Sequence, residues 1–549
     1  MNPPRHKNQP TQRRRFLQST LLVSATAAVY PALAAARAVS SPKPAPSEVP
    51  AFELDEMTIA DLQAGMASGR YTAHSLVERY LARIELVDKQ GPAVNSVIEL
   101  NPDAPAIADA LDKERAAQGV RGPLHGIPVL IKDNIDTADR MLTTAGSLAL
   151  MNSRPAQDSF VARQLRTAGA IILGKTNPSE WANIRSSHST SGWSGRGGLT
   201  RNPYSLDRNA CGSSSGSGAA AAASLCAVAV GTETDGSVVC PSSLCGLVGI
   251  KPTVGLIGRS GIIPIAHSQD TAGPMARTVR DAAILLGALA GVDDNDRATA
   301  KTAEKAAHDY TRFLNPNGLR GARLGVARKY FGFHDGVDKL MEECIAAMKL
   351  QGAEIIDPAD LPSHGKFDDS ELTVLLYELK ADLNTYLAKR GDPQVRTLKD
   401  VIEFNQHNKE KEMPYFGQDL FIKAEAKGPL TGKEYLDALR ADHRLSRKEG
   451  IDAVTDKFRL DAIIASTAGP AWITDLVNGD HVGGGSSNAA AVAGYPDITV
   501  PAGFIAGLPV GISFFGRAWS EPVLLKLAYA FEQTTKARKA PRFAPSVSP

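Results

Sequence analysis

The residue types that could carry out chemistry gather between Cys211 and Ser237. The segment reads CGSSSGSG, then AAAAASLCAVAV, then GTETDGS. Glycine lets the backbone approach a ligand closely, and serine and threonine bring hydroxyl groups to turns. The alanine run predicts a helix that begins at the first loop, and Ala227 to Val230 predicts a short buried strand. A helix and a strand would therefore bring two hydroxyl-rich turns together into a site.

Three interpretations of this segment compete. A flexible Gly/Ser linker is disfavoured because a helix-forming run and a buried strand follow it. A phosphate-binding loop is disfavoured because no Gly-Lys-Ser/Thr follows the glycines. Residues 212–216 also satisfy G-x-S-x-G, which would make Ser214 a nucleophile served by a histidine and an acid. A strand should precede such a nucleophile, whereas Asn202 to Asn209 is typical of a loop.

A lysine stands at the end of an apolar run upstream of the serines. GIPVLIKDN predicts a strand that carries Lys132 inward from the surface. For an arbitrary lysine, an ion pair with Asp133 or Asp136 would be the better interpretation. A desolvated lysine, however, loses proton affinity and can act as a neutral general base.

Several separated segments occur together in a familiar order. They are GPLHGIPVLIKDNID, CGSSSGSGAAAA, GTETDGSVVCPSSLCGLVGIKPT and PDITVPAGFIAGLPVGISFFG. Together they resemble the amidase signature family of serine hydrolases, which use a Ser–cis-Ser–Lys triad. Within it, TETDGSVVCP, ELKADLNTYLAKR and EMPYFGQDLF are most similar to the bacterial peptide-amidase subgroup. The resemblance extends from about residue 53 to the end of the chain.

The resemblance implies an α/β fold: one large domain whose central mixed sheet is covered by helices on both faces. It assigns Ser237 as the nucleophile, Ser213 as the bridging serine and Lys132 as the base. It also implies a cis peptide bond between Gly212 and Ser213. The backbone N–H groups expected to form the oxyanion hole belong to Thr234, Asp235, Gly236 and Ser237.

The implied reaction is hydrolysis of an amide through an acyl-ester intermediate, and the subgroup resemblance implies that the amide is a peptide's C-terminal carboxamide, with release of ammonia. It calls for no cofactor and no metal. Two positions depart from the pattern of many members, because Cys211 and Asp235 stand where those members have glycine. Open alternatives are a general aliphatic or aryl amidase, a Ser–His esterase and a non-catalytic exported binding protein. An amidotransferase subunit acting on charged tRNA is disfavoured by the export signal described below.

The walls of a substrate pocket are harder to predict. Five residues are predicted to contact substrate, with surface or core packing as the alternative for each: Ser187, Trp193, Tyr415, Gly484 and Ser486. Residues 367–458 are predicted to be mostly helical and to lie on the substrate side. Apolar spacing in this region is more often core than ligand-binding surface.

Periodicity predicts the elements around these motifs. Helices are expected at Thr58 to Ala67, Thr72 to Leu86, Asp103 to Ala117, Ser159 to Gly169, Arg277 to Ala290 and Glu521 to Thr534. Strands are expected at Ala170 to Gly174, Arg323 to Ala327, Leu460 to Ala465, Ile498 to Pro501 and Val510 to Phe515. Ile250 to Pro264 is interpreted as short strands around its glycines.

Composition places the chain among soluble globular enzymes. Its 549 residues are 43% hydrophobic and 22% charged. The formal net charge is +2, but residues 1–38 hold six basic side chains and no acidic ones. The remainder has 55 basic and 59 acidic residues, a net charge of −4. Nothing in this balance indicates nucleic acid or a membrane surface as a partner.

The N-terminus predicts export. Gln12 to Leu17, QRRRFL, resembles a twin-arginine motif and precedes an alanine-rich apolar stretch with A-x-A cleavage sites. Polar residues and Pro31 interrupt that stretch, which argues against a permanent membrane span. The predicted boundaries are a signal peptide at 1–38, a Pro-rich linker at 39–52 and the amidase domain at 53–549. The expected partners are the twin-arginine export machinery and an amide substrate, in the periplasm or outside the cell.

Five cysteines are too few to predict a disulfide scaffold. No C-x-x-C or H-E-x-x-H pattern indicates zinc. Cys211 and Cys240 flank the predicted site, so a catalytic thiol is an alternative, but small buried apolar side chains are the favoured interpretation. His125, His188 and His267 are expected to be structural.

Overall fold

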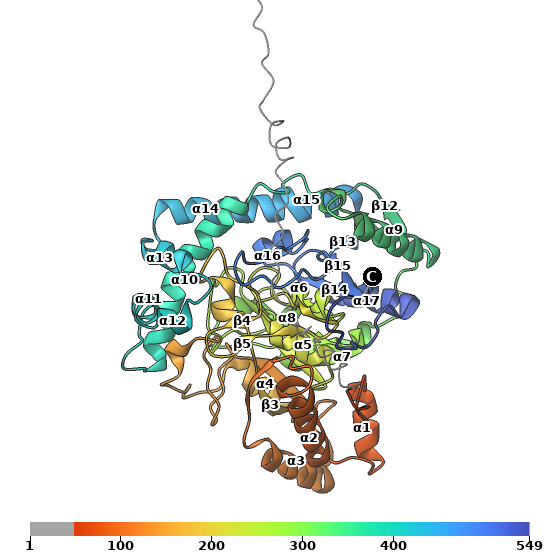
Figure 1. Ribbon diagram of the computed structural model, residues 1–549. Helices are drawn as coiled ribbons and strands as arrows, with labels where there is room; N and C mark the ends of the chain where they lie inside the picture. Colours follow the sequence, from red (N-terminus) through yellow and green to blue (C-terminus); the bar gives the residue numbers. More distant parts are fainter. Residues whose placement is uncertain (1–48, 548–549) are drawn as a thin grey trace, which may run out of the picture. The chain divides into compact units, whose positions relative to one another are not determined.

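An eleven-stranded mixed sheet runs through residues 49–547, the part of the chain that the computed structural model describes (Figure 1). Its strand order is β1-β3-β2-β8-β10-β9-β14-β15-β13-β11-β12. β2 is parallel to β3 and β8, β11 is parallel to β12 and β13, and the other neighbours pair antiparallel. The strands of this sheet are β1 (Val97–Leu100), β2 (Pro128–Lys132), β3 (Ile171–Thr176), β8 (Val228–Glu233), β9 (Val248–Lys251), β10 (Thr271–Ala276), β11 (Arg323–Val326), β12 (Glu354–Ile356), β13 (Ala462–Ser466), β14 (Asp497–Ile505) and β15 (Leu508–Phe515).

Helices pack on the sheet in two groups. α5 and α6 contact each other and the central strands. A second group, α4, α7, α17 and α9, is linked by contacts between its members and packs on strands that include the same central ones. The helices before residue 367 are α1 (Ile59–Ala67), α2 (Ala73–Arg83), α3 (Ala104–Gln118), α4 (Phe160–Thr167), α5 (Ser215–Ala222), α6 (Val239–Leu244), α7 (Val279–Leu289), α8 (Thr302–Lys305) and α9 (Asp335–Leu350). This α/β architecture with a large mixed sheet flanked by helices confirms the predicted fold.

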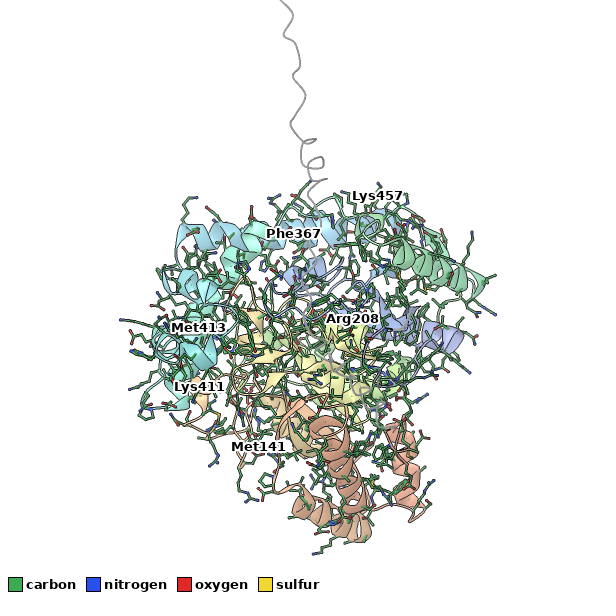
Figure 2. All side chains as sticks on the ribbon, in the orientation of Figure 1. Met141, Arg208, Phe367, Lys411, Met413 and Lys457 are labelled. Atoms are coloured by element: carbon green, nitrogen blue, oxygen red, sulfur yellow. A yellow bond between two sulfur atoms is a disulfide. The ribbon has the colours of Figure 1, made fainter. Side chains whose placement is uncertain are left out.

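A helical region follows, as predicted for residues 367–458, and then two further helices (Figure 1). The helices are α10 (Asp368–Arg390), α11 (Leu398–His407), α12 (Lys409–Glu412), α13 (Asp419–Glu425), α14 (Lys433–His443), α15 (Asp452–Phe458), α16 (Asn488–Ala493) and α17 (Glu521–Thr535). α10 buries Leu376, Leu379, Leu383 and Leu387. Phe367, just before α10 and labelled in Figure 2, belongs to a buried cluster that includes Ile451 and the α15 residue Val454.

The two central strands β2 and β8 are buried along their whole length, as their apolar sequences PVLIK and VAVGTE predict. They run parallel and adjacent, with Ile131 opposite Val230. Lys132 is the last residue of β2, and the GTETDGS turn begins in β8. The sheet therefore brings the lysine and the second serine turn to the same edge.

Two local predictions were wrong. Only Val248–Lys251 of the region around Ile250 to Pro264 forms a strand, and the rest is turns and loops. Asn202 to Asn209, interpreted as a loop, contributes to a two-stranded ribbon of β6 (Arg201–Asn202) and β7 (Ser205–Asn209). A second small ribbon joins β4 (Trp193–Ser194) to β5 (Gly198–Leu199). Short two-residue pairings of this kind leave little periodicity to recognise.

The predicted signal peptide at 1–38 and most of the Pro-rich segment 39–52 lie outside the described residues. Within residues 49–547, none of the helices combines the length and apolar character that crossing a bilayer requires.

Candidate active site

Lys132 is buried and hydrogen-bonded to a serine that is distant in sequence. Its Nζ lies 2.7 Å from Ser213 Oγ, 2.9 Å from Thr232 Oγ1 and 3.2 Å from the Thr232 carbonyl oxygen. Burial lowers the pKa of Lys132 to about 7, although the negative charges of Asp270 and Glu233 act in the opposite direction. A substantial fraction of this lysine is therefore neutral near pH 7.

The contacts of Lys132 suit a neutral amine. Asn134 Nδ2 donates to Thr232 Oγ1 at 2.9 Å, so this hydroxyl oxygen serves as an acceptor. Thr232 thus offers two acceptors, its hydroxyl and its carbonyl oxygen, for the two N–H groups of a neutral lysine. The nitrogen lone pair is then left to accept the Ser213 hydroxyl proton. The arrangement can draw a proton away from Ser213.

The loop between β7 and α5 holds Ser213 and Ser214 in different settings. The peptide bond from Gly212 to Ser213 is cis, and both serines are fully buried. Ser214 Oγ donates to the Thr232 carbonyl at 3.0 Å and accepts from the Thr232 N–H at 3.1 Å. The Ser214 hydroxyl therefore both donates to and accepts from the backbone of Thr232. These contacts give it a structural role.

Ser237 lies in the turn between β8 and α6, beside the Ser213 loop. The Ser214 N–H donates to the Ser237 carbonyl at 3.2 Å, which ties the two serine segments together. The Ser237 side chain makes no hydrogen bond within residues 49–547. Ser237 is 9% exposed, whereas Lys132 and Ser213 are 0% exposed. Of these three residues, Ser237 has the largest exposed fraction.

A buried carboxylate shapes the turn that holds Ser237. Glu233 accepts from the N–H groups of Gly236 at 2.9 Å, Val238 at 2.7 Å and Val239 at 3.0 Å. The Gly236 N–H, predicted among the oxyanion donors, is hydrogen-bonded to Glu233 in this structure. Within the described chain, the N–H groups of Thr234, Asp235 and Ser237 have no acceptor and remain available for an oxyanion.

Asp235 lies against the segment just before α16. Its carboxylate accepts from Ser487 Oγ at 2.6 Å and from Asn488 Nδ2 at 3.3 Å. Asn488 Nδ2 also donates to Glu371 of α10 at 2.7 Å. Burial raises the pKa of both carboxyl groups, and their negative charges repel each other. The first turn of α10 is thus connected through Asn488 to the turn that holds Ser237.

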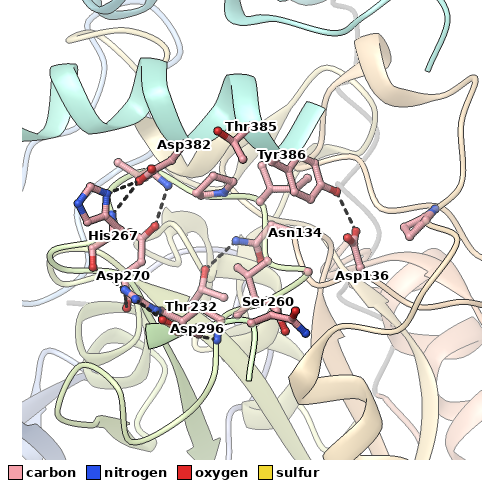
Figure 3. Close-up of a pocket in the computed structure, with 18 of the residues that line it drawn as sticks. Asn134, Asp136, Thr232, Ser260, His267, Asp270, Asp296, Asp382, Thr385 and Tyr386 are labelled. Atoms are coloured by element: carbon pink, nitrogen blue, oxygen red, sulfur yellow. Dashed lines mark hydrogen bonds and ion pairs between the residues drawn. The ribbon is translucent and has the colours of Figure 1, made fainter. Parts of the chain in front are cut away.

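A cavity of about 600 Å³ reaches this site (Figure 3). Ser213 and the Thr232 to Thr234 backbone line it at one end. The α10 residues Asp382, Thr385, Tyr386 and Lys389 line one side of it. Tyr386 points from α10 to Asp136 and donates to its carboxylate at 2.8 Å (Figure 3). Burial raises the pKa of Asp136 to about 6.

A second contact docks α10 onto the loop before β10. His267 Nδ1 lies 2.8 Å from Asp382 Oδ2, and its Nε2 lies 3.3 Å from Glu378 Oε1. The hydrogen bond with Asp382 raises the pKa of His267. Within residues 49–547 these three side chains form the one group with metal-ligand spacing, their ligand atoms lying within 4.8 Å. His267 pairs with both carboxylates, and this pairing accounts for their arrangement.

The five residues predicted to contact substrate do not line the 600 Å³ cavity. Trp193 is buried against Tyr415, with ring centroids 5.4 Å apart, and Ser187 donates to Asp419 at 2.9 Å. Gly484 packs against the Phe333 ring, and Ser486 is fully buried. The lining residues that sequence reasoning missed include five from α10, namely Asp382, Thr385, Tyr386, Lys389 and Arg390, and others from residues 155–163 and 259–265.

Cys211 and Cys240, for which small buried apolar side chains were the favoured interpretation over a catalytic thiol, are linked to each other. The two form a disulfide, with Cα atoms 6.1 Å apart. The pairing is not evident from the sequence because the two cysteines lie 29 positions apart, with loop, helix and strand between them. Cys226, Cys245 and Cys344 are free and buried.

Comparison with known proteins agrees with this geometry. The profile of the family described as Amidase matches residues 75–525. A probable amidase of Arabidopsis thaliana is 42% identical over 502 residues, covering 90% of this chain and 92% of the relative. The native peptide amidase of Stenotrophomonas maltophilia superposes with a TM-score of 0.86 at 50% identity, covering 90% of this chain and 100% of that one.

A peptide amidase solved with the competitive inhibitor chymostatin is 51% identical, with a TM-score of 0.87, and covers 89% of this chain and 100% of that one. The match spans both serine turns, the lysine strand and the helical region. The chain therefore belongs to the amidase signature family and is an amide-hydrolysing enzyme.

Proposed function

We propose that this enzyme hydrolyses the C-terminal carboxamide of peptides, with Ser237 as nucleophile, Ser213 as proton relay and Lys132 as base. The observation that carries the mechanism is the 2.7 Å contact between Lys132 Nζ and Ser213 Oγ in a fully buried setting. A lysine whose pKa is about 7 is matched to base catalysis near neutral pH.

In the first half-reaction Lys132 takes the Ser213 proton while Ser213 takes the Ser237 proton. Ser237 Oγ bonds to the carbonyl carbon, and the oxyanion accepts hydrogen bonds from the free N–H groups of Thr234, Asp235 and Ser237. The C–N bond then breaks, and the relay returns the proton to the nitrogen, which leaves as ammonia.

In the second half-reaction water attacks the acyl ester and gives its proton to the same relay. The bond from Ser237 Oγ to the acyl carbon breaks, and Ser237 regains a proton as the free acid departs. Because each half returns Lys132 to the neutral form, the cycle needs no external acid or base.

The peptide preference rests on the high similarity to peptide amidases over their whole length. A general aliphatic or aryl amidase remains the second candidate. It uses the same relay and differs only in the walls of the acyl-binding pocket. The Ser–His esterase is disfavoured because the Ser214 hydroxyl is held from both sides by Thr232.

Mass spectrometry distinguishes the candidates. A peptide amide, the same peptide as free acid, and a longer peptide with an internal bond at that position are each incubated with enzyme. The proposal predicts conversion of the amide to the acid and no change in the other two. Internal cleavage, or activity confined to simple aliphatic or aryl amides, contradicts the peptide assignment.

We also propose that the enzyme is exported through the twin-arginine route and works in the periplasm or outside the cell. The QRRRFL motif and the apolar segment after it support this. The Cys211–Cys240 disulfide supports it independently, since disulfides persist in oxidising compartments.

A further inference from the structure

The disulfide joins the two segments that carry the proposed catalytic serines. Cys211 directly precedes Gly212 and Ser213, and Cys240 lies three residues after Ser237, in α6. The bridge therefore ties the backbone of the relay serine to the backbone of the nucleophile. Neither cysteine belongs to the relay itself.

Both ends of the bridge are held firmly. Cys211 is 4% exposed and adopts a left-handed backbone conformation, with φ at 59°. Its N–H donates to Asn209 Oδ1 at 2.8 Å, and its side chain packs in a cluster with Trp472. The Cys240 N–H donates to the Gly236 carbonyl at 2.8 Å, so this half is anchored to the nucleophile turn. Cys240 is partly exposed, so a small reductant can reach the bridge.

Few other contacts fix Ser213 relative to Ser237. The direct link between the two segments is the 3.2 Å hydrogen bond from the Ser214 N–H to the Ser237 carbonyl. Ser214 also bonds to Thr232, five residues before Ser237. The Ser237 side chain itself has no partner in the described chain, so its position depends on the backbone. A displacement of about 1 Å at a reacting group can reduce rates by roughly 100-fold.

We propose that the Cys211–Cys240 disulfide is a positioning element for catalysis, and that the oxidised enzyme is the fully active form. This inference rests on the proposed Ser237–Ser213–Lys132 relay. Reduction by a dithiol reagent transfers two electrons and two protons to the bridge. The S–S bond breaks, two thiols form, and the reagent becomes a cyclic disulfide. The Ser213 loop and the start of α6 can then move relative to each other.

The test compares the oxidised enzyme, the enzyme reduced with dithiothreitol without denaturant, and the double variant Cys211→Ser/Cys240→Ser. The readouts are kcat and KM for a peptide amide and the rate of covalent labelling of Ser237 by a fluorophosphonate. Thiol titration establishes that the bridge has opened. We expect kcat and the labelling rate to fall roughly 10- to 100-fold in both altered forms, with KM changed much less. Reoxidation restores the reduced wild type and leaves the double variant unchanged.

Cys344→Ala is the matched control, because Cys344 is a free buried cysteine in α9. Treated with the same reductant, this variant should lose activity like wild type; untreated, it should keep wild-type kcat. All assays run well below the melting temperature of each form, so that unfolding does not contribute. A reduced enzyme with titratable new thiols and unchanged kcat and labelling rate overturns the proposal. If Ser237→Ala retains activity, the relay is wrong instead, which separates the two failures.

Discussion

Lys132 Nζ lies 2.7 Å from Ser213 Oγ, and both side chains are completely buried. An amine in this position has lost most of its hydration, which favours its neutral form. Thr232 accepts its two N–H groups, and Asn134 fixes the Thr232 hydroxyl as an acceptor. The lone pair therefore faces the serine. This relationship supports the proposed role of the buried lysine as a base.

The pH dependence follows from the pKa of Lys132, which is about 7. The relay needs the neutral lysine, so kcat/KM should rise with pH and level off above about pH 7. Below it, the rate should fall about tenfold per pH unit. An ordinary exposed lysine would give a rate that climbs towards pH 10. Initial rates of ammonia release between pH 5 and 10 check this, and a continued rise to pH 10 would falsify the neutral-base assignment.

Asp270 provides a test of how a nearby charge affects the pKa of Lys132. Its negative charge raises the pKa of Lys132, while it accepts a hydrogen bond from Thr234 Oγ1 at 2.6 Å. Asp270→Asn removes the charge and retains an acceptor oxygen. The acidic limb of the pH profile should therefore move to lower pH. A shift in the opposite direction would mean that another group controls this limb.

We expect kcat to depend on the side-chain hydroxyl of Thr232. Thr232→Val removes the hydroxyl that accepts from Lys132 and Asn134. Loss of a hydrogen bond to a chargeable group costs about 1.5–3 kcal/mol, so kcat should fall roughly 10- to 100-fold. Thr232→Ser keeps the hydroxyl and serves as the control, with activity close to wild type. Equal losses in both variants would assign the effect to packing.

Export is tested separately from catalysis. Arg13→Lys with Arg14→Lys should leave a folded, active precursor inside the cell, because twin-arginine export reads this pair. Arg5→Lys lies outside the motif and should be exported normally. Activity and immunodetection in periplasmic and cytoplasmic fractions measure the outcome. Unchanged export of the double variant would exclude the twin-arginine route.

Much of the fold was predictable from local pattern. The strands at β3, β11, β13, β14 and β15 and the helices at α1, α2, α4, α7 and α17 follow from apolar periodicity and agree with the structure to within a few residues. Lys132 was predictable because an unbroken apolar run ends in it. The sequence around the two serine turns also indicated their approach, since a helix and a buried strand connect them.

The remaining features depend on contacts that local sequence does not encode. Tyr386 hydrogen-bonds to Asp136, which lies 250 positions away in the chain, and Asn488 hydrogen-bonds to Glu371, which lies 117 positions away. The cysteine pairing depends on the return of α6 to the Ser213 loop. The use of the Gly236 N–H by Glu233 depends on the conformation of a single turn. Each is a consequence of tertiary packing, which places side chains together without regard to spacing in the chain.

The most direct test of the account is ammonia release from a peptide amide by Ser237→Ala measured beside Ser214→Ala. Ser237→Ala should lose about 10⁴-fold or more of kcat while staying folded, because the nucleophile is gone. Ser214→Ala should keep measurable turnover, because its hydroxyl only bonds the Thr232 backbone. Circular dichroism and melting curves confirm folding of both. An active Ser237→Ala beside an inactive Ser214→Ala would contradict the assignment of Ser237 as the nucleophile.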